Sequence, residues 1–193
     1  FDQQKDNILN KKIGILGCGW LGLPLAKSLI DDKRTVFGTT TSDSKIELLH
    51  KANIVPYTID LTENGIKGNI KGFLAELDLL IKKIQHLYDE IKKTSLGRII
   101  FISSTSVYGD IEGRVTEDSP TRPNTESGKQ LLAAENIFLN DGSLITTIIR
   151  FGGLIGPSRH PVTILAGKTD LSNGNDPVNL IHLNDCIGII KLV

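Results

Sequence analysis

The sequence predicts an α/β fold in which a doubly wound parallel sheet is covered by helices on both faces. Short apolar segments rich in β-branched residues alternate with segments whose apolar residues recur every three or four positions. This alternation is typical of strand–helix–strand units that build a parallel sheet. A glycine-rich turn joins the first strand to the first helix. We expect about six or seven strands, within the usual range for one sheet.

The first third of the chain contains two strand–helix pairs. Residues 12–16 form a short apolar strand, and residues 21–30 form its helix, because their apolar residues share one helical face. Pro24 falls in the first turn of this helix, where its missing N–H costs least. Residues 35–40 are rich in β-branched residues and predict the second strand. Residues 43–51 predict a short helix after it.

The rest of the chain continues the same alternation. Residues 54–59 and 77–81 are apolar strands, and residues 83–93 carry apolar side chains at helical spacing. The later elements are strands over 98–103 and 144–151, and helices over 126–139 and 186–193.

One junction and the final helix look incomplete. Strand 77–81 runs into helix 83–93 without the connection of about 2–6 residues that usually joins such elements. The last helix reaches Val193 without a capping residue. We therefore expect the natural protein to hold further residues between Ile81 and Lys82, and others after Val193.

The charge balance favours a small-molecule partner. Twenty-two basic residues match 22 acidic ones, so no global field attracts nucleic acid or an anionic membrane. No apolar segment approaches the about 18 residues of a membrane span. Cys18 and Cys186 make no metal-binding or redox pair, and the four histidines show no metal-ligand spacing. We expect a cytoplasmic protein without a metal site. The sequence does not indicate an oligomeric state.

A turn with the spacing of a dinucleotide-binding site joins the first strand to its helix, and it reads Gly17-Cys18-Gly19-Trp20-Leu21-Gly22. Gly17 permits a tight turn, Gly19 lets the backbone approach a diphosphate, and Gly22 lets helix and strand pack closely. The helix N-terminus adds N–H groups and a positive dipole end. The turn predicts a Rossmann domain that binds NAD or NADP. We assign no chemistry to the side chains of Cys18 and Trp20.

The end of the second strand indicates which cofactor binds. An Asp or Glu there would bind the 2′-hydroxyl of NAD, whereas hydroxyl or basic residues suit the 2′-phosphate of NADP. The chain offers Thr40 and Thr41, with Lys45 one helical turn further on and no acidic residue before Asp43. We therefore favour NADP over NAD.

Several further motifs follow the later strands in a fixed order. They are Asp60-Leu61, Ser103-Ser104-Thr105-Ser106-Val107-Tyr108-Gly109, Arg150…Gly156-Pro157 and the segment 179–185. Together with the glycine turn, they resemble the NAD-dependent epimerase/dehydratase family of extended and atypical short-chain dehydrogenases/reductases. The resemblance spans residues 12–190.

The resemblance implies roles at the matching positions. Ser104 falls where the family has a catalytic Ser or Thr, whose hydroxyl would donate a hydrogen bond to a substrate carbonyl or alcohol oxygen. Ser103, next to it, would contact the cofactor. Asp60 and Leu61 match residues that contact the adenine. The stretch from Arg150 to Pro157 would form the loop after the last predicted strand, beside the nicotinamide and the substrate.

The segment after Gly156 supplies the remaining candidates. A guanidinium suits phosphate or carboxylate, so Arg159, with His160 beside it, could bind an anionic group of the substrate. We expect an N-terminal tail over 1–11 and an NAD(P)-binding domain over 12–156. Residues 157–193 would form part of a small, incomplete substrate lobe and a segment that returns to the core.

The chain departs from the family at its proton-transfer pair. Family enzymes carry a Tyr and, four residues later, a Lys that lowers the pKa of the Tyr. The ungapped match places Ser127 and Leu131 at these positions, and no shift of register restores the pair. Tyr108 belongs to the serine motif and is expected to be a packing residue. The resemblance is therefore to an atypical subgroup.

Three functions are open on this basis. The first is an oxidoreductase or epimerase-like enzyme that acts on a nucleotide sugar or a similar carbonyl or alcohol. The second is an NAD(P)-binding or sensing protein without catalysis, which the missing Tyr/Lys pair favours. The third, a two-domain hydroxyacid dehydrogenase, fits the glycine turn alone, and the motifs around Ser104 and Gly156 argue against it. We favour the enzyme.

Overall fold

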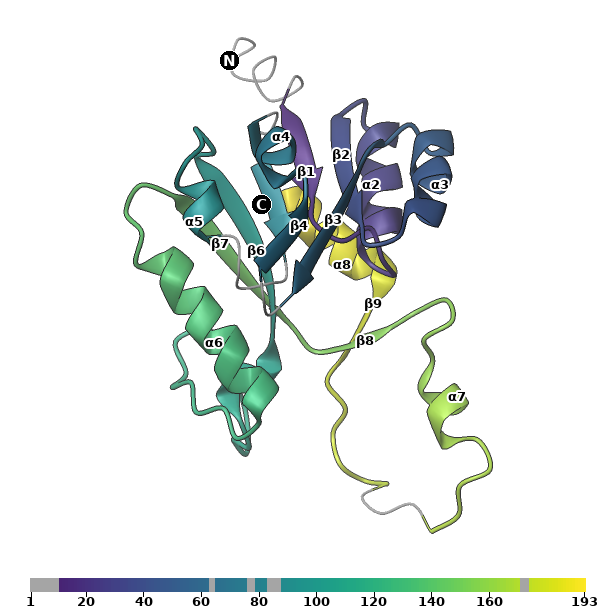
Figure 1. Ribbon diagram of the computed structural model, residues 1–193. Coiled ribbons are helices and arrows are strands. Elements are labelled where there is room, and N and C mark those ends of the chain that lie inside the picture. The colour runs from purple at the N-terminus through teal and green to yellow at the C-terminus, as the bar shows by residue number, and fades with distance from the viewer. Residues whose placement is uncertain (1–10, 63–64, 76–78, 83–87, 171–173) are drawn as a thin grey trace, which may run out of the picture.

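The structure is a computed structural model that describes residues 11–62, 65–75, 79–82, 88–170 and 174–193. Within these residues a seven-stranded sheet has the order β4-β3-β2-β1-β5-β6-β7 (Figure 1). The strands are β1 (Lys12–Ile15), β2 (Thr35–Thr40), β3 (Val55–Thr62), β4 (Gly65–Gly68), β5 (Leu79–Lys82), β6 (Arg98–Ser104) and β7 (Ile145–Phe151).

All strands of this sheet except β4 run parallel, which confirms the predicted fold class. β1 pairs with β2 on one side and with β5 on the other. The strand order therefore reverses at β1, and a ligand crevice is expected outside the carboxyl ends of these strands. The antiparallel β4 pairs with β3 and was not predicted. Its four residues include two glycines, which leaves no strand pattern to detect.

Helices form a layer on each face of the sheet (Figure 1). α2 (Gly22–Asp31), α3 (Ile46–Lys51) and α8 (Leu183–Leu192) contribute to one buried cluster. α4 (Ile70–Ala75), α5 (Tyr88–Ile91) and α6 (Glu126–Leu139) contribute to the other. Short 3-10 helices lie at η1 (Asp43–Lys45) and η2 (Thr105–Tyr108).

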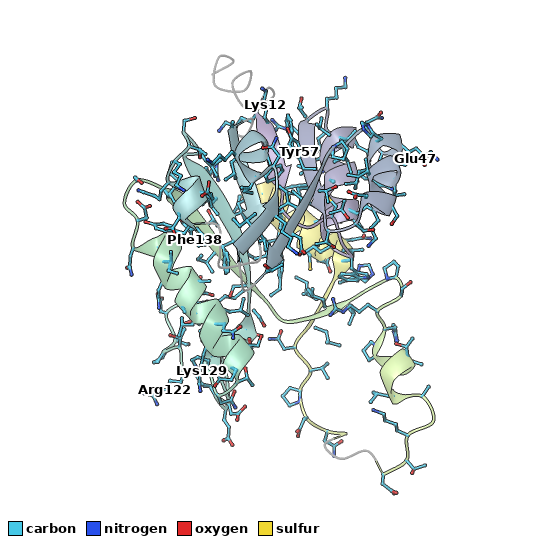
Figure 2. All side chains as sticks on the ribbon, in the orientation of Figure 1. Lys12, Glu47, Tyr57, Arg122, Lys129 and Phe138 are labelled. Carbon is cyan, nitrogen blue, oxygen red and sulfur yellow. The ribbon has the colours of Figure 1, made fainter. Side chains whose placement is uncertain are left out.

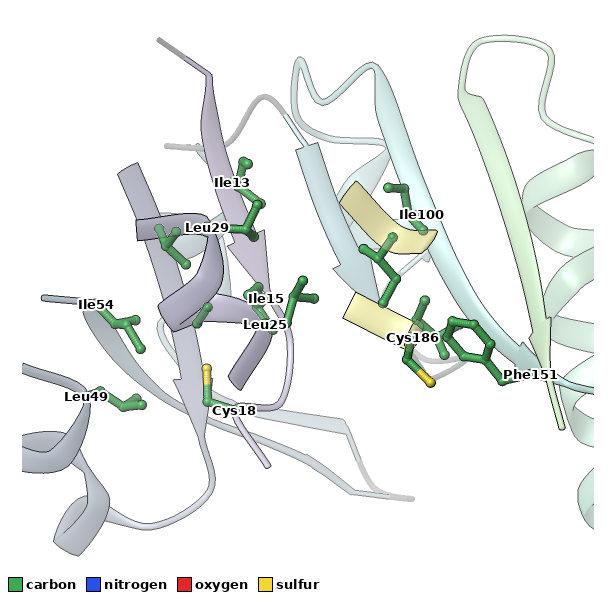
Figure 3. Close-up of a cluster of buried hydrophobic side chains, with 14 residues drawn as sticks. Ile13, Ile15, Cys18, Leu25, Leu29, Leu49, Ile54, Ile100, Phe151 and Cys186 are labelled. Carbon is green, nitrogen blue, oxygen red and sulfur yellow. The ribbon is translucent and has the colours of Figure 1, made fainter. Parts of the chain in front are cut away.

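β6 shows how one strand serves both layers. Ile100 and Ile102 belong to the cluster with α2 and α8, whereas Ile99 and Phe101 belong to the cluster with α6. Successive side chains of a strand point to opposite faces, so a strand apolar throughout is buried on both. Each such side chain stabilises the fold by roughly 1.5–3 kcal/mol. Figure 3 shows Phe151 beside Cys186 in the cluster to which Ile100 also belongs.

The connection after β5 begins later than expected. β5 continues through Lys82, which pairs with Phe101 of β6. The expected insertion between Ile81 and Lys82 falls at the last pair of this strand and stays a prediction. The helix predicted over 83–93 is described only as Tyr88–Ile91. Residues 83–87 of that prediction lie outside the described residues, as do 1–10 of the predicted tail.

The segment after β7 leaves the sheet and returns to it. β8 (Gly153–Ile155) pairs in parallel with β9 (Leu180–His182), and α7 (Pro161–Leu165) lies on the excursion between them (Figure 1). α8 then packs on α2, where Lys191 Nζ lies 2.6 Å from an Asp32 carboxylate oxygen. None of the helices described combines the length and the hydropathy needed to cross a bilayer.

Candidate functional site

The glycines of the first turn fit the roles that the sequence assigns to them. Gly17 has φ +96°, in the region that favours glycine. A Cβ on Gly22 would lie 2.1 Å from the Gly17 carbonyl oxygen, so the helix can start here only without a side chain. A Cβ on Gly19 would meet no atom within 4 Å among the described residues. The space beside Gly19 is thus open for a ligand.

Thr39, at the end of β2, holds this turn in place. The Gly17 N–H donates to Thr39 Oγ1 at 2.9 Å, and the Cys18 N–H donates to the Thr39 carbonyl oxygen at 2.8 Å. Thr39 is 2% exposed. The sequence offered no sign of this role, because a threonine at a strand end is unremarkable and the contact spans 22 residues.

The Cys18 side chain faces the core and not the ligand space, so the cofactor contact predicted for this residue would come from its backbone. Its Sγ packs against Gly38 of β2 so closely that a Cβ on Gly38 would lie 2.5 Å away. Burial raises the pKa of the Cys18 thiol to about 12. At the start of α2 the Leu23 and Leu25 N–H groups donate to the Gly19 and Leu21 carbonyl oxygens, at 3.0 Å and 3.1 Å, and Pro24 has no N–H. The donors left to face a ligand are therefore those of residues 19–22.

A cavity of about 440 Å³ adjoins the glycine turn. Its wall includes Gly17, Gly19, Trp20, Leu21 and Gly22 on one side, and Ser103, Ser104, Gly152, Gly153, Leu154 and Arg159 elsewhere. The structure thus brings together residues from the ends of β1, β6 and β7. We call it the first cavity.

The two serines at the end of β6 line the first cavity. Ser103 is 3% exposed, and its Oγ has no hydrogen-bond partner within the described part of the chain. Ser104 Oγ accepts a hydrogen bond from the Ser106 N–H at 3.2 Å and caps η2. Because Ser104 is the acceptor there, its own proton remains available for a ligand oxygen. A buried hydroxyl without a partner fits a site that a polar ligand completes.

The residues expected near the adenosine end lie outside the wall of the first cavity. Thr40 is buried, and its Oγ1 accepts from the Ser42 N–H at 3.2 Å, whereas Thr41 is exposed. Asp60 and Leu61 lie on the β3–β4 hairpin. The structure also places an acid here, since Asp43 accepts a hydrogen bond from Thr58 Oγ1 at 2.6 Å.

The positions of the missing Tyr/Lys pair lie on the first turns of α6. Ser127 is exposed, and Leu131 packs against the second cluster. Gly128 sits against η2, because a Cβ there would lie 2.8 Å from the Ser106 carbonyl oxygen. Lys129 pairs with Glu126 at 2.7 Å on the exposed side. Figure 2 shows Lys129 near the N-terminal end of α6 and Phe138 near its C-terminal end.

Arg150 lies within β7 rather than in a substrate loop, which corrects that expectation. Its Nη2 lies 2.6 Å from Glu135 Oε2, and Glu135 is fully buried. Its Nη1 donates to the Tyr108 hydroxyl at 2.7 Å, and its Cζ lies 4.9 Å from the centre of the Tyr108 ring. The Glu135 carboxylate raises the pKa of Arg150 above its usual range. The guanidinium is therefore committed inside the protein, and Glu135 was missed from sequence.

Tyr108 is a packing residue with a satisfied hydroxyl, as expected. It is 7% exposed and lines, with Arg150, a second cavity of about 850 Å³ beside Ile148 and Val178.

The turn after β8 places Arg159 on the wall of the first cavity, whereas Gly156 and His160 of the same segment do not line its described part. Gly156 packs on Trp20, where a Cβ would lie 3.1 Å from the indole Cζ2. His160 Nδ1 accepts from the Val162 N–H at 3.2 Å and caps α7. Trp20, to which we assigned no chemistry, donates its indole N–H to the Pro157 carbonyl oxygen at 2.7 Å.

Comparison with known proteins gives related sequences and folds. The chain is 36% identical to the Escherichia coli protein YeeZ over 200 residues, which covers 95% of this chain and 73% of YeeZ. A Methylobacillus flagellatus protein, described by inference as an NAD-dependent epimerase/dehydratase, superposes with a TM-score of 0.70 and 25% identity, over 94% of this chain and 69% of that one.

A UDP-glucuronic acid 4-epimerase from Bacillus cereus, solved with UDP-glucuronic acid and NAD, superposes with a TM-score of 0.76 and 20% identity. The superposition covers 94% of this chain and 73% of the epimerase, and shows the shared fold. No family model matches the sequence.

Proposed function

Because the chain belongs to the NAD-dependent epimerase/dehydratase family, we propose that it binds NAD(P) in the first cavity and acts on a nucleotide sugar or a similar alcohol or carbonyl compound. One observation supports this above all. Gly19, which has open space beside it, and Ser103, whose buried hydroxyl has no partner among the described residues, both line the first cavity. A ligand with a diphosphate and several hydroxyls would satisfy both.

The protein would hold the cofactor through backbone and hydroxyl groups. The N–H groups of residues 19–22, where α2 begins, would bind the diphosphate. Ser103 would bind a cofactor hydroxyl or amide. Bound NAD(P) supplies a hydride acceptor or donor, which the polypeptide itself lacks. The residues at the end of β6 would orient the substrate.

Ser104 is the proposed catalytic residue. Its hydroxyl would donate a hydrogen bond to the substrate oxygen and stabilise the charge that develops there. Ser127 and Leu131 cannot carry a proton near neutral pH. We propose that water takes the alcohol proton when the hydride leaves the substrate carbon, so that turnover rises with pH more steeply than in family members with the Tyr/Lys pair.

The residues after β2, where the adenosine of the cofactor would lie, favour one of the two cofactors NADP and NAD. The exposed Thr41 and the half-buried Ser42 offer hydroxyls to a 2′-phosphate, whereas the Thr40 hydroxyl is bonded to the Ser42 backbone, so we propose NADP as the preferred cofactor. Asp43 lies in the same place and is bonded to Thr58. Calorimetry with NADPH and NADH separates the two. A lower Kd for NADH would refute the preference.

The second candidate is a protein that binds NAD(P) without catalysis. The exposed Ser127 and the packed Leu131 favour it, because they leave the two positions of the Tyr/Lys pair without a titrating group. The two functions differ in turnover and agree in binding.

The test combines binding with turnover. The chain is titrated with both cofactors by calorimetry, and cofactor oxidation or reduction is then followed by absorbance with a panel of UDP-sugars and simple carbonyl compounds. The enzyme predicts turnover that Ser104→Ala reduces at least about 100-fold, as for other positioned acid–base groups. Binding without turnover on any member supports the second candidate, and absence of binding refutes both.

A further inference from the structure

We propose that Trp20 and Arg159 form a clasp across the first cavity, in which Trp20 positions the Arg159 guanidinium to bind a diphosphate group of a ligand held there. This inference rests on the proposed function, because it concerns a ligand of the same cavity. Trp20 would be a positioning residue and Arg159 the ligand-binding group.

Trp20 links the glycine turn to a distant part of the chain. Its backbone belongs to the turn before α2, while its indole N–H donates to the carbonyl oxygen of Pro157 at 2.7 Å. The two residues are 137 positions apart. The indole also packs against Gly156, where a Cβ would lie 3.1 Å from the indole Cζ2 and 3.0 Å from the Leu183 Cβ. The indole thus fixes the turn 156–159 against the glycine turn.

The turn 156–159 has a defined backbone. Gly156 and Arg159 exchange two backbone hydrogen bonds, of 3.1 Å and 3.0 Å. Pro157 and Ser158 form its corner, and Ser158 has φ +60°. A proline followed by a residue at positive φ is typical of a type II turn. Ser158 lacks the freedom of glycine, so this conformation costs free energy that the contacts around it must offset.

The Arg159 side chain is presented from this turn. Its Cζ lies 5.3 Å from the centre of the Trp20 ring, in the range of a cation–π contact. A guanidinium on an aromatic face keeps its N–H groups free at its edge for bidentate bonds to phosphate. Arg159 lines the first cavity together with Gly17, Gly19 and Gly22.

Arg159 would add a full positive charge to the binding site for the diphosphate. Among the described residues on the wall of the first cavity, Arg159 carries the only formal charge. The N-terminus of α2 offers roughly half a positive charge, whereas a diphosphate diester carries two negative ones. The diphosphate can belong to the cofactor or to a nucleotide sugar. The shared wall with the glycine turn favours the cofactor.

The chain offers a direct readout, because Trp20 is its only tryptophan. The full chain is titrated with NADP⁺, NAD⁺ and UDP, and indole fluorescence and calorimetry are recorded. In the wild type we expect NADP⁺ or NAD⁺ to change the Trp20 emission, because the guanidinium on its ring turns toward the phosphate. Arg159→Met should raise Kd about tenfold and flatten its dependence on salt. Arg122→Met is the matched control, since Figure 2 places Arg122 beyond the N-terminal end of α6.

Trp20→Phe tests the positioning role. Phenylalanine keeps a ring and removes the N–H donor to Pro157. We expect a rise in Kd of roughly threefold. The double variant should bind no more weakly than Arg159→Met alone, because Trp20 acts through Arg159. If Trp20 only stabilises the fold, the losses of affinity in Trp20→Phe and Arg159→Met should add in the double variant, and Trp20→Phe should leave the salt dependence of Kd unchanged.

The outcomes separate the clasp from the proposed function. If Arg159→Met changes the Kd of UDP alone, measured at saturating cofactor, the clasp is supported and its ligand is the diphosphate of the nucleotide sugar. A wild type that binds cofactor with an Arg159→Met variant that binds equally well overturns the clasp alone. A wild type that binds none of the three nucleotides overturns both.

Discussion

At the residue scale, the glycines of the turn 17–22 are constrained by different neighbours, and alanine separates them. Gly19→Ala places its Cβ in open space, so the melting temperature should stay unchanged while NAD(P) affinity falls at least about tenfold, as for a lost charge-assisted bond. Gly22→Ala would press on the Gly17 carbonyl oxygen, so both stability and affinity should fall. Thermal unfolding and calorimetry on the two variants test this. Unchanged affinity in Gly19→Ala would contradict the site.

The buried ion pair of Arg150 is a second prediction at this scale. Glu135→Gln leaves a guanidinium with 19% exposed side chain beside a neutral amide. Breaking one partner of a buried pair should lower the free energy of unfolding by about 3 kcal/mol. Lys129→Gln breaks the exposed pair with Glu126 and should cost below about 0.5 kcal/mol. Urea denaturation measures both, and equal losses would show that the Arg150 pair is not effectively buried.

At the element scale, Asp141 ties α6 to α5. It accepts hydrogen bonds from Tyr88 at 2.9 Å and from the Ser143 N–H at 2.9 Å, and pairs with Lys92 at 3.0 Å. Its bonds to Ser143 and Lys92 hold the pKa of Asp141 below its usual range. A lowered folded-state pKa stabilises the protein above the unfolded pKa of about 3.9, and the stabilisation is lost as the pH falls toward the folded value.

Asp141→Asn should therefore lower the melting temperature at neutral pH. The difference from the wild type should shrink below about pH 4, where the wild-type carboxyl begins to be protonated in the unfolded state. A melting-temperature difference that stays constant from neutral to acidic pH would show that the charge of Asp141 contributes nothing.

Elements with a long local pattern were predictable, and those held by distant contacts were not. The apolar runs of β1, β2, β6 and β7 carry their own signal, as do the spacings in α2 and α6. β4, α4, β8 and β9 are too short for any periodicity. The glycine turn was found because its residues are contiguous. Thr39, Glu135 and the Trp20–Pro157 contact were missed, since their partners lie 15 to 137 residues away.

At the scale of the whole molecule, one buried cluster joins the two ends of the described chain. Ile13 and Ile15 of β1 share it with Cys186 and Ile190 of α8. The boundary predicted at residue 157 would make α8 part of a separate unit unless this segment returns to the core. Cooperative unfolding of the cluster distinguishes these two cases, because residues in one packed core lose their protection together.

The reactivity of the two cysteines measures the unfolding of this cluster, because both side chains are buried in it. Burial raises the pKa of both thiols, that of Cys18 to about 12, so neither forms a reactive thiolate in the folded protein at neutral pH. We expect alkylation to be slow without urea and both cysteines to become reactive in the same urea transition, as read by mass spectrometry of peptides. The circular dichroism transition should coincide with it. Reaction of Cys186 at clearly lower urea than Cys18 would mean that α8 detaches first and that the final segment is a unit of its own.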